Sequence, residues 1–196
     1  MPMSQNFLRE WAYKLLPHVP WNWAHWLRHR AMLRYVLNKL SINCVLDVGA
    51  NRGQYGTLLR KIGYHGWILS FEPVRDSYEV LKAVAAERER WRVFPYALGA
   101  TNERREINVA EETVFSSFLT PREESQIRFP TNRLERKEEV DVRRLDRVLE
   151  TCLMDISSPR IYLKLDTQGF DLSVIEGAQN ILPRILALQT EVALDG

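Results

Sequence analysis

The sequence lacks the features typical of disulfide-rich, zinc-binding, nucleic-acid-binding and membrane-spanning proteins. Its 196 residues include only two cysteines, Cys44 and Cys152, each within apolar sequence, so we predict no disulfide framework and no zinc-type cluster. The 27 Lys and Arg residues nearly balance the 25 Asp and Glu residues, and a net charge of +2 is too small to indicate nucleic-acid binding. No apolar run approaches the roughly 18–20 residues that span a bilayer. Arg9, Trp11 and Lys14 interrupt any signal-peptide core, so we expect a cytoplasmic protein.

The N-terminal residues have the periodicity of helices. Apolar side chains recur at three- and four-residue spacing over about 5–16, PHVP interrupts the pattern, and a second helix is predicted over about 21–40. We treat 1–42 as an N-terminal helical segment packed on the domain; the alternative is a substrate lid or a helix at a membrane surface. The broad apolar face of the second helix comprises Trp23, Trp26, Leu27, Leu33, Leu37 and Leu40, and its other face carries Arg28, Arg30, Arg34 and Lys39.

From residue 44 onward, apolar runs alternate with helical periods. The runs predict strands at 44–48, 67–71, 91–94, 161–165 and 185–194, and helices are predicted at about 55–62, 76–90, 145–152 and 171–182. The segment DSYE, 76–79, is typical of a capping box. This alternation predicts an α/β fold with a parallel sheet and right-handed crossovers. Residues 100–142 differ, because two alternating stretches typical of edge strands flank a polar segment in which we expect a substrate loop.

The stretch VLDVGANRGQYG, 45–56, places a glycine-rich turn between a strand and a helix. This arrangement is the nucleotide-binding corner of open α/β sheets. Gly49, Gly53 and Gly56 give the spacing G-x-x-x-G-x-x-G, which differs from the G-x-G-x-x-G loop that wraps a dinucleotide pyrophosphate and from a P-loop. A ligand with a carboxylate instead of phosphates suits such a loop, and S-adenosylmethionine is a ligand of that kind.

An acid ends the next strand at the matching position. Glu72 in SFEP follows Gly49 by 23 positions, and Pro73 fixes the turn after it. A carboxylate there can accept hydrogen bonds from both ribose hydroxyls, which is the role of the acid at the equivalent site of nucleoside-binding sheets. The two motifs together predict nucleoside binding.

Four segments, in order, resemble the FkbM-type family of S-adenosylmethionine-dependent methyltransferases. They are DVGANRG, FEP, YALG and KLDTQGFDLSVIEGA, and the resemblance covers roughly 43–194. It implies a class I methyltransferase with a Rossmann-like α/β sheet of order 3-2-1-4-5, which methylates a hydroxyl on a small-molecule or carbohydrate acceptor. LDTQGFD replaces the commoner IDVEGxE, so Gln168 stands where many relatives have glutamate.

The resemblance also implies which residues bind S-adenosylmethionine. The residues that would line the methionine end are Asp47, Gly49, Asn51 and Gly53. Glu72 would bind the ribose, and Phe71 and Pro73 would flank the adenosine. Tyr96 and Ala97 would meet the adenine edge, with a purely structural role in the core as an equal alternative for Tyr96.

Two acids are candidates for the chemistry. Asp166 ends the fourth parallel strand on the same rim as Glu72, so it is the first candidate for orienting or deprotonating the acceptor hydroxyl. Stabilising the cofactor's positive charge or ordering the turn is the alternative role for Asp166. Glu191 on the last strand is the second candidate, and Ser116 and Ser117 lie where they could reach the substrate. No cluster of metal-ligand spacing is visible, so we expect no metal.

The predicted sheet is shorter than a full class I sheet, which has seven strands. Only five core strands precede the end of the sequence at VALDG, so we expect a methyltransferase domain over 43–196 that lacks its last hairpin. The fifth strand would then expose an apolar edge, which predicts a homodimer. Two other functions stay open: a nicotinamide-dependent oxidoreductase, which the glycine spacing disfavours, and a non-catalytic nucleoside-binding module, which the short C-terminus and Gln168 favour.

Overall fold

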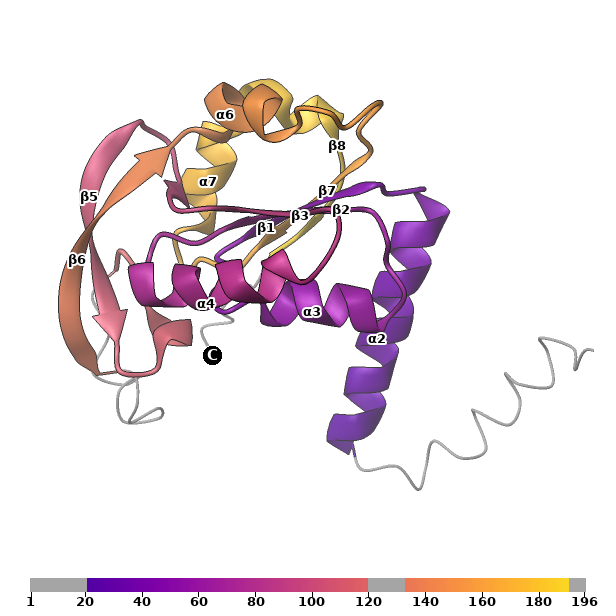
Figure 1. Ribbon diagram of the computed structural model, residues 1–196, viewed down its shortest axis with the longest axis horizontal. Coiled ribbons are helices and arrows are strands. Elements are labelled where there is room, and N and C mark those ends of the chain that lie inside the picture. The colour runs from indigo at the N-terminus through magenta and orange to yellow at the C-terminus, as the bar shows by residue number, and fades with distance from the viewer. Residues whose placement is uncertain (1–20, 120–132, 191–196) are drawn as a thin grey trace, which may run out of the picture.

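A five-stranded parallel sheet forms the centre of the molecule, and helices cover both of its faces (Figure 1). The computed structural model describes residues 21–119 and 133–190, with side chains from residue 27 onward. All neighbouring strands of this sheet are parallel, which confirms the predicted Rossmann-like order 3-2-1-4-5. In spatial order the strands are β3 (Trp91–Phe94), β2 (Trp67–Phe71), β1 (Cys44–Val48), β7 (Ile161–Leu165) and β8 (Ile185–Gln189).

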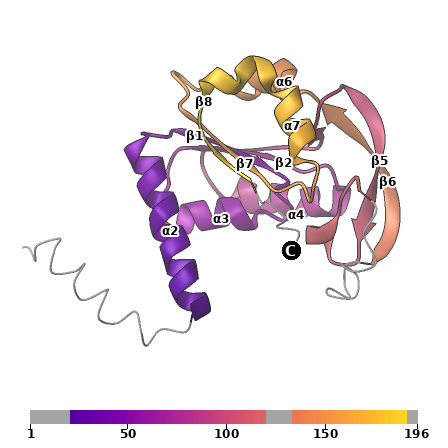
Figure 2. The ribbon, with the colours of Figure 1, turned by 180° about the vertical axis from the view of Figure 1, so that it is seen from behind.

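The two central strands, β1 and β7, are apolar except for Asp47 and Lys164, because both of their faces are covered. Every residue of β1 and β7 is buried. On one face, Val45 and Ile68 pack with Leu59, Leu81 and neighbouring side chains of the helices α3 (Gln54–Lys61) and α4 (Arg75–Ala86). On the other face, the sheet packs against α6 (Leu145–Cys152) and α7 (Asp171–Gly177), which lie above it in both views, opposite α3 and α4 (Figures 1 and 2).

The second half of the helix α2 (Trp21–Lys39) packs on the domain. Leu33 and Leu37 are buried in the same cluster as the α3–α4 face of the sheet, whereas the first half of α2 extends away from the sheet (Figures 1 and 2). Leu27, which we expected on the apolar face, is 48% exposed. The predicted helix at 5–16 and the side chains of Trp23 and Trp26 lie outside the described part of the chain. In that described part, no helix combines the length and the apolar character needed to span a bilayer.

Two helix boundaries differ from their predictions. α4 begins at Arg75 without a side-chain cap from its own chain segment, so DSYE does not form the predicted capping box. Instead, the backbone N–H of Arg75 donates to Glu138 Oε1 at 2.9 Å, a partner distant in sequence. The helix predicted over 171–182 ends at Gly177, where an added Cβ would lie 1.9 Å from the Gly99 carbonyl oxygen, and a 3₁₀ turn, η3 (Gln179–Arg184), continues the chain.

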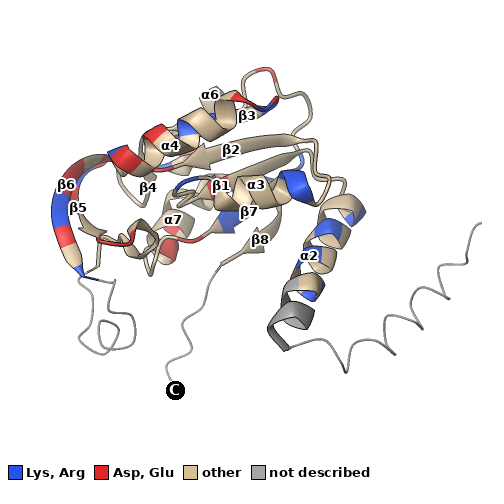
Figure 3. Ribbon diagram, turned by 60° about the horizontal axis from the view of Figure 1, so that its bottom comes forward, with Lys and Arg blue, Asp and Glu red and all other residues tan. Residues whose placement is uncertain are grey.

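A second, three-stranded sheet stands beside the carboxyl ends of the main sheet (Figure 1). It contains β4 (Ala97–Leu98), β5 (Glu103–Ala110) and β6 (Leu134–Arg143) in the order β4-β6-β5, and the two long strands pair with each other as an antiparallel ribbon. The outer face of the ribbon alternates in charge (Figure 3), with Arg104 beside Glu139 and Asp141. Its inner face buries Ile107 and Val140 against the start of α4. The ribbon therefore forms a wall beside the carboxyl ends of the main sheet, where the residues of the predicted motifs lie.

Candidate active site

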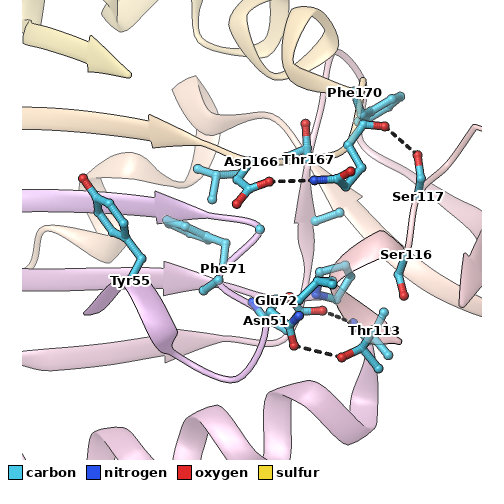
Figure 4. A pocket seen from close by; sticks show the side chains of 18 of the residues that line it. Asn51, Tyr55, Phe71, Glu72, Thr113, Ser116, Ser117, Asp166, Thr167 and Phe170 are labelled. Atoms are coloured by element: carbon cyan, nitrogen blue, oxygen red, sulfur yellow. Dashed lines mark hydrogen bonds between the residues drawn. The ribbon is translucent and has the colours of Figure 1, made fainter. Parts of the chain in front are cut away.

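A cavity of about 540 Å³ lies at the carboxyl ends of β1, β2 and β7 (Figure 4). This position is the topological switch point of the sheet, because the chain leaves β1 toward β2 on one side and later returns to β7 on the other. The volume is in the range of small-molecule sites. Its far wall comes from the second sheet and from the 3₁₀ turn η2 (Thr113–Phe115).

The turn after β1 is fixed by a close approach of two backbones. Gly49 has a φ of 72°, and an added Cβ would lie 2.0 Å from the Asp166 carbonyl oxygen, so only glycine fits there. The N–H groups of Gly49 and Ala50 both donate to the Phe71 carbonyl oxygen at 3.1 Å, which joins this turn to the end of β2. The glycine thereby brings the ends of β1, β2 and β7 together along one wall of the cavity.

Glu72 lies at the centre of this wall, and the backbone holds its carboxylate in place. Its Oε2 accepts a hydrogen bond from the Asn51 N–H and its Oε1 accepts one from the Val74 N–H, each at 2.8 Å. Burial raises the pKa of Glu72 to about 7, although these two hydrogen bonds act to lower it. A carboxylate oxygen can accept two hydrogen bonds, so each oxygen retains capacity for a ligand donor.

Asn51 connects the glycine turn to the opposite wall. It adopts a φ of 46°, and its Oδ1 accepts a hydrogen bond from the Thr113 hydroxyl at 3.0 Å (Figure 4). Its Nδ2 is buried and has no hydrogen-bond partner among the described residues, although the side chain lines the cavity. A buried amide donor without a partner is unfavourable unless a ligand or water accepts from it.

A cluster of charges lies at the β7 side of the cavity. Lys164 Nζ lies 3.2 Å from Asp47 Oδ1, 3.3 Å from Asp166 Oδ2 and 3.4 Å from the Gly49 carbonyl oxygen. Burial lowers the pKa of Lys164, but the two aspartates outweigh burial and the net shift is upward. Gln168 Nε2 donates to Asp166 Oδ1 at 2.9 Å, so both oxygens of Asp166 have one partner each.

One comparison with known proteins finds a match over most of the chain. The methyltransferase FkbM domain matches residues 47–193, well over half of the chain. The chain belongs to the FkbM methyltransferase family. A search of curated proteins finds no significant match to this chain.

Most of the residues predicted to bind the cofactor line the cavity of the FkbM domain, but three do not. Those that line it are Gly49, Asn51, Phe71, Glu72, Pro73 and Ala97. Asp47 is fully buried, accepts a hydrogen bond from Ser70 and pairs with Lys164, so it does not face the cavity beside Glu72 as expected. Gly53, at φ 84°, is the N-cap residue of α3, and an added Cβ there would lie 3.0 Å from Leu81 Cδ1.

Tyr96 occupies the core, which was the alternative for this residue. Its ring lies 5.7 Å from that of Phe71 and 5.8 Å from that of Phe94, and its hydroxyl is 3.4 Å from Cys152 Sγ. Ala97, the next residue, does line the cavity.

The candidate residues for chemistry have different positions. Asp166 lines the cavity and its side chain is 31% exposed. Glu191 lies outside the described residues. Ser116 and Ser117 both line the cavity, but the Ser117 hydroxyl donates to the Gln168 carbonyl oxygen at 2.8 Å and so holds the turn after β7 (Figure 4).

Several residues that line the cavity of the FkbM domain were not predicted from the sequence. Lys164 was detectable as a lone lysine within the apolar strand IYLKL, because such a residue needs buried partners. Phe118 and Phe170 form an aromatic wall, with ring centroids 4.6 Å apart. Tyr55 and Gln189 close the β8 end through a 2.9 Å hydrogen bond, but nothing in their local sequence indicates this contact across 134 positions.

Proposed function

We propose that this domain is an S-adenosylmethionine-dependent methyltransferase that methylates a hydroxyl group of a small-molecule or carbohydrate acceptor. The observation that carries the proposal is Glu72. It is a buried carboxylate at the end of β2, fixed by two backbone N–H groups beside a glycine turn, and it lines the cavity with acceptor capacity to spare. This arrangement suits a vicinal diol such as that of a ribose.

The residues around the cavity fit such a cofactor. Glu72 would hold the ribose, and Phe71 and Pro73 would flank the adenosine. The Asn51 Nδ2 donor, which is buried without a partner among the described residues, would find an acceptor in the carboxylate or hydroxyls of the cofactor. Gly49 brings the ends of β1 and β7 together beside the ligand, because an added Cβ there would lie 2.0 Å from the Asp166 carbonyl oxygen.

The residues of the domain would position the acceptor and its proton. When bound, S-adenosylmethionine supplies an electrophilic methyl group on a positively charged sulphur. Phe118 and Phe170 present apolar surface that excludes water from the far wall of the cavity. Asp166, whose carboxylate is oriented by Lys164 and Gln168, would orient the acceptor hydroxyl and receive its proton. Alignment of the two reactants supplies most of the rate enhancement in a displacement of this kind.

Isothermal titration calorimetry with S-adenosylhomocysteine and with NAD tests the proposal against its alternatives. We expect binding of S-adenosylhomocysteine and none of NAD. Binding of NAD alone would support the nicotinamide-dependent oxidoreductase, although the glycine spacing of the loop disfavours that function. If S-adenosylhomocysteine binds but no methyl transfer occurs to a panel of hydroxylated small molecules and sugars, the non-catalytic nucleoside-binding module becomes the better account.

A further inference from the structure

Three charged side chains meet where β1 and β7 lie side by side, and their charges do not cancel. Lys164 contacts Asp47 and Asp166 at 3.2 and 3.3 Å, which leaves two carboxylates against one ammonium group. We call these three residues the Lys164 cluster; its net charge is −1. Asp47 is fully buried and absent from the cavity lining, whereas Asp166 is partly exposed and lines it. The uncompensated charge is therefore presented to the cavity by Asp166.

No other lysine or arginine of the described lining offsets this charge. Among the described residues around the cavity, Lys164 is the only side chain of that kind, His29 is the one histidine, and Glu72 is a further acid. Gln168 donates a hydrogen bond to Asp166, but its amide is neutral. In a partly buried site the effective dielectric constant is about 20, so the electrostatic attraction of one unit charge for an opposite charge extends across a cavity of this size.

We infer that the Lys164 cluster makes the cavity selective for the charge on the ligand's sulphur. The cavity binds cationic S-adenosylmethionine more tightly than neutral S-adenosylhomocysteine, and Lys164 is the positioning residue that sets the imbalance. This inference rests on the proposed function. Since the product has lost the positive charge, the same imbalance favours release of the product and rebinding of the substrate form.

Variants of the Lys164 cluster separate the effect of charge from the loss of a contact. Dissociation constants for both compounds are measured by calorimetry without an acceptor, and the ratio of the S-adenosylhomocysteine value to the S-adenosylmethionine value is compared. Asp166→Asn and Asp47→Asn each bring the cluster to zero net charge, and both should lower this ratio by about ten-fold. The effect of Asp47→Asn is the more informative, because Asp47 does not line the cavity.

A double variant returns the charge without returning the contacts. Asp47→Asn/Lys164→Met removes one negative and one positive charge, so the cluster is again −1, and the ratio should return toward the wild-type value. Asp141→Asn is the matched control, because it makes the same chemical change at an aspartate that pairs with Arg104 on the ribbon, outside the cavity lining. It should leave the ratio unchanged.

The outcomes distinguish this inference from the proposed function. If Asp47→Asn still binds S-adenosylhomocysteine but keeps the wild-type ratio, the inference is wrong and the proposed function stands. A ratio as low in the double variant as in Asp47→Asn would also overturn the inference, since lost packing would then explain the effect. If the wild-type protein binds neither compound, the proposed function itself fails.

Discussion

Replacement of Glu72 by alanine should weaken binding of S-adenosylhomocysteine while most of the fold survives. The carboxylate makes two 2.8 Å hydrogen bonds to backbone N–H groups and has capacity for the ribose hydroxyls. If both ribose contacts are lost and the hydroxyls find no other acceptor, affinity falls by about 1–3 kcal/mol. This corresponds to a dissociation constant roughly 5- to 150-fold higher, which calorimetry measures directly. Glu72→Gln keeps the volume and one acceptor oxygen, so it should have a smaller effect.

Glu138 provides the matched control for this experiment. Like Glu72, it accepts a hydrogen bond from a backbone N–H near the start of α4, that of Arg75 at 2.9 Å, but it does not line the cavity. Glu138→Ala should therefore leave the affinity for S-adenosylhomocysteine unchanged. If folded Glu72→Ala binds this compound as tightly as the wild type, Glu72 is not a ligand and the reasoning from the end of β2 fails.

Three further predictions concern stability and assembly. Because burial raises the pKa of Glu72 from 4.5 to about 7, the native state keeps a proton that the unfolded chain releases. The free energy of unfolding should therefore fall by up to about 3 kcal/mol as pH rises through this window, and denaturant titrations of Glu72→Gln should lack that slope. Gly49→Ala should destabilise the fold by about 3 kcal/mol or more, since its Cβ would lie 2.0 Å from a carbonyl oxygen. Gly63→Ala is its control: φ is 84° but nothing lies within 4 Å of the added Cβ, so thermal melts should show a loss of only about 1–2 kcal/mol. The edge strand β8 exposes Leu186 and Leu188 by 42% and 46%, so light scattering should detect a dimer that Leu188→Lys disrupts; a monomer at high wild-type concentration would contradict this.

The strands and the glycine turn were predictable because local sequence determines them. Strands covered on both faces are mostly apolar, and β1 and β7 for this reason are apolar runs interrupted only by Asp47 and Lys164, which pair with each other. Gly49 and Glu72 are the first residues after β1 and β2, so their positions at the carboxyl ends of the sheet were predictable from strand direction alone.

The partners of the site residues were not predictable, because they come from distant segments. Asp47 lies opposite Ser70 and Lys164 in the sheet register, and this alternation turns its side chain toward the α3 face and away from the cavity. The motif around Asp47 does not reveal that a lysine 117 positions later neutralises it. Likewise, the pairing of β5 with β6 depends on side chains far apart in sequence, so the wall that they form could not be placed beforehand.

A crystal structure with S-adenosylhomocysteine bound tests the central claim most directly. The account predicts both ribose hydroxyls within hydrogen-bonding distance of the Glu72 carboxylate, with the sulphur on the Asp166 side of the Gly49 turn. Electron density for the compound elsewhere on the protein, or a ribose turned away from Glu72, would contradict it.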